Sequence, residues 1–412
     1  MNYFIKNIKI NKLLHLQNLE IEIPKETPHL IITGKNGSGK TILLKAIADF
    51  LDIVKEDKYM EFVDYHKNLE HWQKRMNNTP QGMILQGNQQ VAYYQKKIDQ
   101  LFGKVNIGLI DSAKLIEGFQ KKDFIISFYG AGRLARMNEP KNPIKPNLQI
   151  KGKAEESLTN QFLYFLSDLK VQEALARNEQ QTADADHIKE WFESFEQLLQ
   201  DIYQDRNLKL VFNYKDYSFT IKTEGKTFKF TEMSDGFIAA IDIIADLILK
   251  MQNGDTLTRN YLKQGIVLID EIETHLHLEL QRIVMPLLTK VFPNIQFIIT
   301  THSPFVLSSM PDAVAYDLEH REPINDLTEY SYEALTEGYF GVKTESSYME
   351  MKLNSLRELL EHENPTNGDS EQLLALIQDF EQIPEAVSPV LIGEFRQLKV
   401  RYSDKINTLK KS

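Results

Sequence analysis

The sequence contains no cysteine and no long apolar run, and both absences narrow what the chain can be. Without a thiol among its 412 residues, it can form neither a disulfide nor a thiolate metal site. No stretch reaches the roughly 18 consecutive apolar residues of a membrane-spanning helix. Residues 1–10 alternate in polarity, unlike a signal peptide. The sequence therefore predicts no membrane association and a cytoplasmic location.

The chain also lacks an excess of positive charge. Its 48 basic and 58 acidic residues give a formal net charge of −10. This balance argues against a surface that binds nucleic acid throughout, although a local basic groove can coexist with an acidic total. Nucleic-acid binding therefore stays open.

A glycine-rich loop carries the first chemical motif. The apolar run 29–33 precedes it, residues 34–41 read Gly-Lys-Asn-Gly-Ser-Gly-Lys-Thr, and residues 42–51 have helical apolar spacing. Strand, loop and helix in this order match the P-loop, in which backbone amides and a helix N-terminus hold phosphate. We expect Lys40 to reach the β and γ phosphates of ATP and Thr41 to hold Mg²⁺. A glycine turn that only joins a strand to a helix is the alternative. The predicted nucleotide-binding residues are Gly34, Asn36, Gly37, Ser38, Gly39, Lys40 and Thr41.

An apolar strand that ends in two acids supplies the second half of the predicted site. Residues 266–269 are apolar and lead into Asp270 and Glu271. Asp270 is expected to complete the Mg²⁺ shell with Thr41. Glu271 is expected to orient the attacking water and accept its proton. Taken alone, the acids could instead cap a helix.

Three further segments resemble the ABC-type ATPase heads of the SMC, RecF and OLD group. They are Met-Ser-Asp-Gly at 233–236 before a long helix, Glu-Thr-His-Leu-His at 273–277, and Thr-Thr-His-Ser-Pro at 300–304. The resemblance implies that Ser234 and Gly236 touch the γ-phosphate held by an opposite subunit, and that His302 contacts the γ-phosphate as a switch histidine. It makes Lys40, Glu271 and His302 the predicted catalytic residues.

Each of these segments also has a plainer interpretation. Residues 233–236 could be an ordinary helix N-cap, His302 could be structural, and the run 273–277 could hold a metal instead of lying at a dimer interface. No secure glutamine-bearing loop is present, and the turn at 129–133 occupies its place. Arg133 or Arg136 could approach a phosphate there, or pair with an acid at the surface.

The resulting fold prediction is an α/β P-loop NTPase, an ABC-type ATPase head with a mixed sheet. Residues 1–138 form the N-terminal lobe with the P-loop, 139–206 a helical insertion, 207–325 the C-terminal lobe, and 326–412 a helical region. Residues 57–104 read as a helical or mobile insertion without an assigned chemistry.

The chain lacks the long heptad arm of SMC proteins and the Toprim metal ligands of OLD nucleases. With those absences it looks most like the ATPase subunits of bacterial anti-phage systems of the Septu type, including those attached to retrons. That resemblance implies a slow ATPase that forms a head-to-head dimer or higher oligomer and controls a separate effector, such as an HNH nuclease. Two alternatives stay open: a RecF-like DNA-repair clamp, and a scaffold that ATP stabilises with little hydrolysis.

Overall fold

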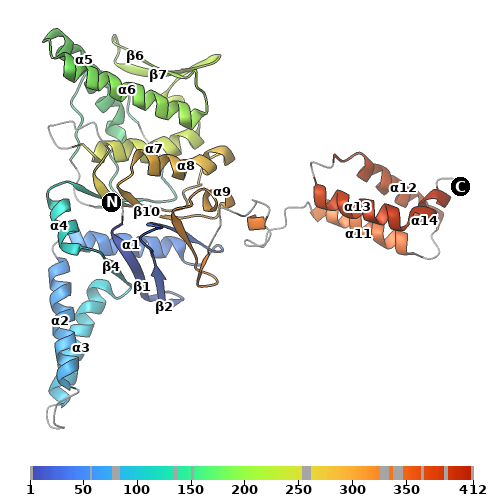
Figure 1. Cartoon of the computed structure of the whole chain (residues 1–412), viewed down its shortest axis with the longest axis horizontal. Coiled ribbons are helices and arrows are strands. Elements are labelled where there is room, and N and C mark those ends of the chain that lie inside the picture. The colour runs from blue at the N-terminus through green and yellow to red at the C-terminus, as the bar shows by residue number, and fades with distance from the viewer. Residues whose placement is uncertain are drawn as a thin grey trace. The chain divides into compact units, whose positions relative to one another are not determined.

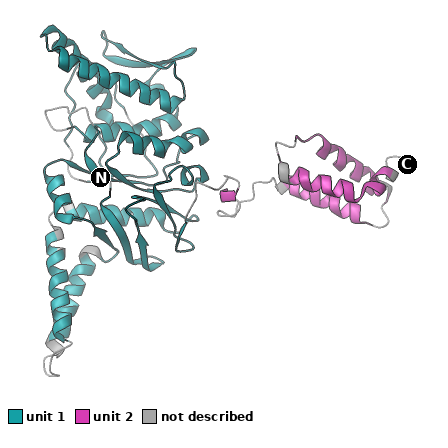
Figure 2. Ribbon diagram, in the orientation of Figure 1, with its two compact units in different colours: residues 1–330 teal, residues 331–412 magenta. Residues whose placement is uncertain are grey.

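The computed structural model describes residues 3–55, 58–76, 84–133, 137–149, 153–252, 261–324, 334–336, 347–362, 366–384 and 388–409. The chain folds as two compact units, residues 1–330 and 331–412 (Figure 2). The predicted boundaries at 138 and 206 lie inside the first unit, and the division of the chain into four parts stays a prediction.

Six described strands, among them the one labelled β10 in Figure 1, form the central sheet of the first unit. Their order is β12, β11, β3, β10, β9, β5. They are β3 (His29–Thr33), β5 (Phe124–Tyr129), β9 (Gln264–Ile269), β10 (Ile295–Thr300), β11 (Ala313–Asp317) and β12 (Glu322–Ile324). All neighbours pair parallel except β12, which pairs antiparallel with β11. The predicted mixed α/β sheet is confirmed. Because parallel strands end at one edge, the loops that follow β3, β5, β9, β10 and β11 share that edge.

A second sheet is antiparallel, with the order β2, β1, β4. It consists of β1 (Ile5–Leu13), β2 (Leu16–Glu22) and β4 (Val105–Leu109). The sequence predicts two shorter strands with a polar turn between them, whereas pairing continues to Leu13 opposite Leu16. Both of these leucines are buried, so the polar stretch is anchored to the core at the tip of the hairpin.

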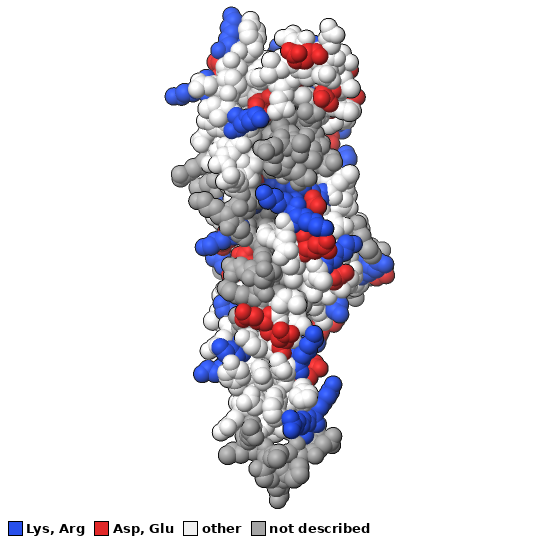
Figure 3. All heavy atoms as spheres, turned by 90° about the vertical axis from the view of Figure 1, so that its left-hand side faces the viewer, with Lys and Arg blue, Asp and Glu red and all other residues white. Residues whose placement is uncertain are grey.

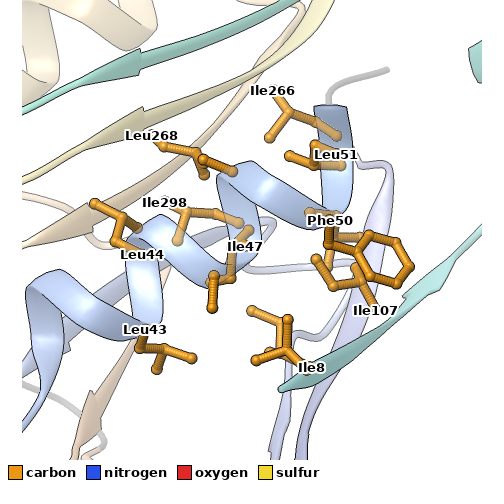
Figure 4. Packing of buried hydrophobic residues seen from close by; sticks show 14 of the residues in the cluster. Ile8, Leu43, Leu44, Ile47, Phe50, Leu51, Ile107, Ile266, Leu268 and Ile298 are labelled. Atoms are coloured by element: carbon orange, nitrogen blue, oxygen red, sulfur yellow. The ribbon is translucent and has the colours of Figure 1, made fainter. Parts of the chain in front are cut away.

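Helix α1 (Lys40–Lys55) packs between these two sheets and carries the core of the unit. Figure 4 shows its apolar side chains lying between Ile266, Leu268 and Ile298 of the central sheet and Ile8 and Ile107 of the second sheet. The helix begins directly after the glycine loop. Packing on both sides therefore fixes the loop that precedes it.

Residues predicted as a helical or mobile insertion form two helices, α2 (Lys58–Met76) and α3 (Ile84–Phe102), which pack against each other. A short helix, α4 (Ser112–Gln120), leads into β5. The sequence prediction missed β4, α4, β11 and β12.

The predicted helical insertion contains α5 (Phe162–Asn178) and α6 (Thr182–Tyr203), followed by a three-stranded sheet of β6 (Lys209–Asn213), β7 (Ser218–Thr223) and β8 (Lys226–Lys229). Aromatic rings join these elements, including Phe165 of α5 packed edge to face on Trp191 of α6 with centroids 5.6 Å apart. Tyr203 stacks on Phe237 of α7 (Asp235–Lys250), with centroids 4.0 Å apart. The insertion thus packs directly onto α7. The helices α8 (Leu278–Val291) and α9 (Pro304–Leu307) follow later in this unit.

The second unit is a helical bundle of α11 (Ser347–Glu361), α12 (Asn367–Glu381), α13 (Pro389–Arg401) and α14 (Ser403–Leu409). It has a hydrophobic core of its own, which includes Leu356, Ile377, Phe380 and Phe395. Across both units, none of the described helices combines the length and apolarity needed to cross a bilayer.

Candidate nucleotide-binding site

The glycine loop follows β3 and folds back on itself before α1 begins. Gly34, Gly37 and Gly39 have φ values of 129°, 84° and 100°, which residues with a side chain rarely adopt. Gly34 is also closely packed, because a Cβ there would lie 3.1 Å from the Asp317 carboxylate and 3.1 Å from the Ser38 hydroxyl. Asn36 is exposed at the tip of the loop. The loop conformation therefore requires the glycines that the sequence motif contains.

Lys40 lies at the start of α1 and is almost completely buried, with 5% of its surface exposed. Its Nζ donates to the carbonyl oxygens of Gly34 at 2.8 Å and Lys35 at 3.1 Å, so the side chain folds over the loop. Burial lowers the pKa of Lys40, and the carboxylates of Glu271 and Glu273 oppose this shift. The ammonium group is thus surrounded by acids beside a loop rich in amides.

Asp270 follows β9 directly and is buried, with 1% of its surface exposed. Its Oδ1 accepts hydrogen bonds from Thr41 Oγ1 at 3.2 Å and from Thr300 Oγ1 at 2.7 Å. The hydroxyl and the carboxylate that the sequence assigns to Mg²⁺ are therefore adjacent, although 229 positions separate them along the chain. Hydroxyl and carboxylate oxygens are ligands that Mg²⁺ prefers.

Glu271, the predicted general base, lies in a tight turn with φ of 44°, an uncommon value for a residue other than glycine. Its backbone amide donates to Thr300 Oγ1 at 2.7 Å, and its carboxylate accepts from Thr274 Oγ1 at 3.4 Å. The charge of Glu271 acts on both Lys40 and His302. The structure therefore brings together the three residues predicted to be catalytic.

The loop that carries His302 is held by Glu273, a residue that the sequence placed only in a run similar to a family motif. One carboxylate oxygen of Glu273 accepts from Thr301 Oγ1 at 2.7 Å, and the other accepts from the His302 amide at 2.5 Å. Burial raises the pKa of Glu273, and these two hydrogen bonds oppose that shift. Burial, followed by the charge of Lys40, lowers the pKa of His302. Both effects favour the neutral form of its imidazole.

Ser234 and Gly236 lie at the N-terminus of α7, as predicted, where Ser234 is exposed. Within the described residues, the Ser234 side chain makes no capping hydrogen bond, unlike the plainer N-cap interpretation. A Cβ on Gly236 would lie 2.8 Å from the carbonyl oxygen of His275 and 3.0 Å from the His277 ring. His275 and His277 are exposed. The segments 233–236 and 273–277 thus pack against each other.

Two other segments contact the glycine loop and were missed at the sequence level. His15, in the turn between β1 and β2, places Nε2 3.0 Å from the carbonyl oxygen of Ser38. Glu319, just after β11, pairs with Lys35 at 2.8 Å. Both contacts come from parts of the chain that lack a recognisable motif, so only the tertiary structure reveals them.

Arg133 does not form the surface ion pair that the sequence left open. Its guanidinium donates to the carbonyl oxygens of Asp270 at 3.0 Å and Ile272 at 2.9 Å. Burial lowers its pKa, and the charge of Asp242 opposes this shift most strongly. Arg136, the other candidate for a phosphate contact, lies outside the described residues. The metal alternative for the run 273–277 gains no support, because no cluster of three potential metal ligands occurs in the described part of the chain.

These features define a P-loop protein with an ABC-type ATPase head. They are the glycine loop after β3, the buried Asp270 after β9, and the edge of the parallel sheet that both share. The chain belongs to the family described as "AAA domain, putative AbiEii toxin, Type IV TA system", whose model matches residues 84–308. The matched region contains Asp270, Glu271 and His302, while the glycine loop lies before it.

Curated relatives are similar over parts of the chain. A Septu protein PtuA from Bacillus mycoides (strain KBAB4) is 28% identical over 326 residues, which cover 77% of this chain and 41% of that protein. A retron Vc95 probable ATPase from Vibrio cholerae serotype O1 biovar El Tor is 31% identical over 165 residues, 40% of this chain and 29% of that protein. The chain thus spans less than half the length of these relatives.

Solved structures of SMC heads are also similar. One is the Smc head bound to the C-terminal winged-helix domain of ScpA, with 12% identity and a TM-score of 0.38, covering 76% of this chain and 94% of that one. Another is an Smc head with an extended coiled coil, bound to the C-terminal domain of ScpA derived from Pyrococcus furiosus. It has 13% identity and a TM-score of 0.33, covering 78% of this chain and 95% of that one.

Proposed function

We propose that this chain binds ATP with Mg²⁺ and hydrolyses it slowly. The observation that carries the proposal is the convergence of Lys40, Thr41, Asp270, Glu271 and His302 at one sheet edge from three separate segments of the sequence. Structural ion-pair networks also gather charges. However, they do not require a glycine loop with this conformation.

The residues present fit a magnesium-bound nucleotide. Ser38 Oγ is buried in the glycine loop and has no hydrogen-bond partner among the described residues. Within the described part of the chain, Lys40 donates to two loop carbonyls, which a phosphate oxygen could replace. Bound ATP with Mg²⁺ would supply an electrophilic γ-phosphoryl group. The chain would contribute a phosphate cradle, Thr41 and Asp270 as metal ligands, and Glu271 to hold the water and accept its proton.

The proposed assembly is a dimer in which each head completes the site of the other. Its support is Ser234 at the N-terminus of α7, which is exposed and free of a capping contact within the described residues, while the neighbouring Gly236 is buried against His275. A helix N-terminus binds anions through its amides. We therefore place Ser234 and Gly236 against the γ-phosphate held by the opposite head.

The proposed biological role is control of a separate effector, a nuclease such as an HNH protein, in bacterial anti-phage defence. The relatives named for Septu and retron systems support this role. The effector and the trigger are proposed, because the chain matches less than half of the length of these relatives. On the face in Figure 3 the coloured basic and acidic side chains are interspersed, so this face gives no support to a clamp on DNA.

The first test compares ATP turnover and oligomeric mass in the native chain, Lys40→Ala and Glu271→Gln, with and without ATP and Mg²⁺. Lys40→Ala should lose nucleotide binding, and Glu271→Gln should bind ATP, lose turnover by about 100-fold and accumulate as the dimer. Lys45→Ala is the matched control on the same helix, because Lys45 is exposed. Unchanged turnover in Glu271→Gln would refute hydrolysis at this site and favour the scaffold.

The biological role is tested with the chain and its neighbouring genes in a phage-infection assay. We expect Lys40→Ala to abolish protection, while Lys45→Ala retains it. Protection that needs no second gene would refute effector control. Binding of duplex DNA that weakens steeply with salt would favour the clamp instead.

A further inference from the structure

The turn that carries Glu271 extends beyond the strands that would normally pair with it. β5 and β9 run parallel, and their last backbone contact joins the Asp270 amide to the Tyr129 carbonyl at 2.8 Å. After that point β5 turns away through Gly130, while the chain after β9 continues as the turn 270–272. The carbonyl oxygen of Glu271 accepts from the Thr274 amide at 2.9 Å, whereas those of Asp270 and Ile272 need another donor, because buried backbone groups are costly to leave unpaired.

Arg133 supplies that donor. Its Nη1 lies 3.0 Å from the Asp270 carbonyl oxygen, and its Nη2 lies 2.9 Å from that of Ile272. Both nitrogens also lie within 3.5 Å of the carbonyl oxygen of Glu271. One planar group thus spans three consecutive carbonyls, which we call the Arg133 clasp.

The amides of the same turn are held from the opposite side by β10. The Glu271 amide donates to Thr300 Oγ1 at 2.7 Å, and the Ile272 amide donates to the Thr300 carbonyl at 3.2 Å. The φ of 44° at Glu271 is unfavourable for a residue with a side chain and persists only when its surroundings impose it. Thr300 and Arg133 impose it together, one through amides and the other through carbonyls.

We propose that Arg133 is a positioning residue for ATP hydrolysis. Its clasp fixes the backbone of Glu271, so that the carboxylate of Glu271 points toward the attacking water. This inference rests on the proposed function and adds to it the residue that occupies the place of the missing glutamine loop. Arg133 acts through the backbone of Glu271 and is not itself a catalytic residue.

The geometry requires arginine in particular. A guanidinium presents donors in a rigid plane, so Nη1 and Nη2 reach separate carbonyls at once, whereas a lysine ammonium is a single point on a flexible chain. The charge is retained despite burial because Asp242, Glu273 and Asp270 surround it. A lysine at position 133 would preserve the charge but could not contact the carbonyl oxygens of Asp270 and Ile272 at the same time.

Tyr129 provides a matched control on the same strand. Its hydroxyl donates to Asp246 Oδ2 at 2.6 Å in the buried contact between β5 and α7. Asp246 keeps two further partners, the Leu158 amide and Lys250. Tyr129→Phe therefore removes one buried hydrogen bond near the clasp without touching the carbonyls of 270–272.

The experiment uses the full chain and compares Arg133→Lys, Arg133→Gln and Tyr129→Phe with Glu271→Gln. It measures kcat, KM, ATP affinity and thermal stability. Both Arg133 variants should lose kcat by about tenfold or more while ATP affinity stays within about threefold, because misplacing a catalytic group slows chemistry more than binding. Tyr129→Phe should lower stability and leave kcat within about twofold, because losing one buried hydrogen bond lowers the free energy of unfolding but does not move the Glu271 carboxylate.

A second readout needs no nucleotide. Hydrogen exchange at the amides of residues 271–276 should be about tenfold faster in Arg133→Lys than in the native chain, and unchanged in Tyr129→Phe, because local opening follows local hydrogen bonding. If Glu271→Gln is slow while Arg133→Lys matches the native chain in kcat and exchange, the inference is wrong and the proposed function stands. If Glu271→Gln hydrolyses ATP at the native rate, the proposed role of Glu271 fails, and the inference fails with it.

Discussion

Replacing Glu273 with alanine should displace His302, the predicted switch histidine, without disturbing the residues that bind the nucleotide. Glu273 receives two hydrogen bonds, from Thr301 Oγ1 at 2.7 Å and from the His302 amide at 2.5 Å. Neither donor belongs to the glycine loop. The substitution therefore releases the loop that carries His302 and leaves Lys40 and Thr41 in place.

The size of the effect follows from these contacts. A hydrogen bond to a charged acceptor contributes about 1.5–3 kcal/mol, so two of them set an upper limit of roughly 3–6 kcal/mol. The loss is smaller in practice, because water can reach the half-buried site and because removing the carboxylate also removes its desolvation cost. We expect about 1–3 kcal/mol of destabilisation. A displacement of about 1 Å at His302 would then lower kcat by roughly 10–100-fold.

Glutamine at position 273 should have a milder effect. Its carbonyl can accept from the His302 amide, and its amide can donate to the Thr301 hydroxyl, which accepts as well as donates. The pKa of Glu273 is raised above its ordinary value of 4.5. The folded state therefore binds this proton more tightly, and the stability from protonation is present below pH 4.5 and lost as pH rises through the raised pKa. Glu273→Gln should remove this part of the pH dependence.

The assay combines chemical denaturation with steady-state hydrolysis, and Glu279→Ala is the control, because Glu279 is exposed at the start of α8. We expect ATP affinity to change by less than about threefold in Glu273→Ala, since the cradle is intact. A native kcat in Glu273→Ala, with the expected loss of stability, would refute the claim that Glu273 positions His302. A lost ATP affinity would show that the carboxylate acts on the cradle instead.

Two further predictions concern the α7 surface and the histidine itself. Gly236→Ala places a Cβ 2.8 Å from the His275 carbonyl and should weaken ATP-dependent dimerisation, with about 1–3 kcal/mol of overpacking. Gly393→Ala, where no described heavy atom lies within 4 Å of the added Cβ, should instead stabilise α13 by up to about 1 kcal/mol. Sedimentation measures dimerisation and denaturation measures stability, and a stabilising Gly236→Ala or a destabilising Gly393→Ala would contradict these predictions. The pKa of His302 is lowered by burial and by Lys40, so the neutral ring is favoured above pH 6.5 and this stability is lost as pH falls through the lowered pKa. Titration of the His302 ring by NMR should give a midpoint below 6.5, and a midpoint above it would contradict the burial described for this loop.

Much of the site could be predicted because its residues are consecutive. The glycine loop, the two acids after β9 and the segment after β10 each combine a local pattern with a defined position beside a strand or helix. The predicted strands at 29–33 and 266–269 agree with β3 and β9 within two residues. Continuous apolar runs identify buried parallel strands, because both faces are covered.

The sequence missed the elements whose burial depends on distant neighbours. β4 alternates only weakly and is a strand because β1 offers it a pairing edge. β11 pairs with β3, and Leu30 lies opposite Val314 from a distant part of the sequence. This pairing follows from the strand order of the central sheet and not from local pattern. Local propensity carries no information about such partners.

The sequence by itself determined that this chain has a P-loop, two adjacent acids and a histidine after a later strand, because each is a short pattern with its own physical logic. Only the tertiary structure decided which side chains hold those groups in place. Arg133 spans the turn of Glu271, Glu273 holds the His302 loop, and Thr300 links both acids. These contacts join loops at one sheet edge, and the strand order that makes them neighbours is set by packing throughout the unit.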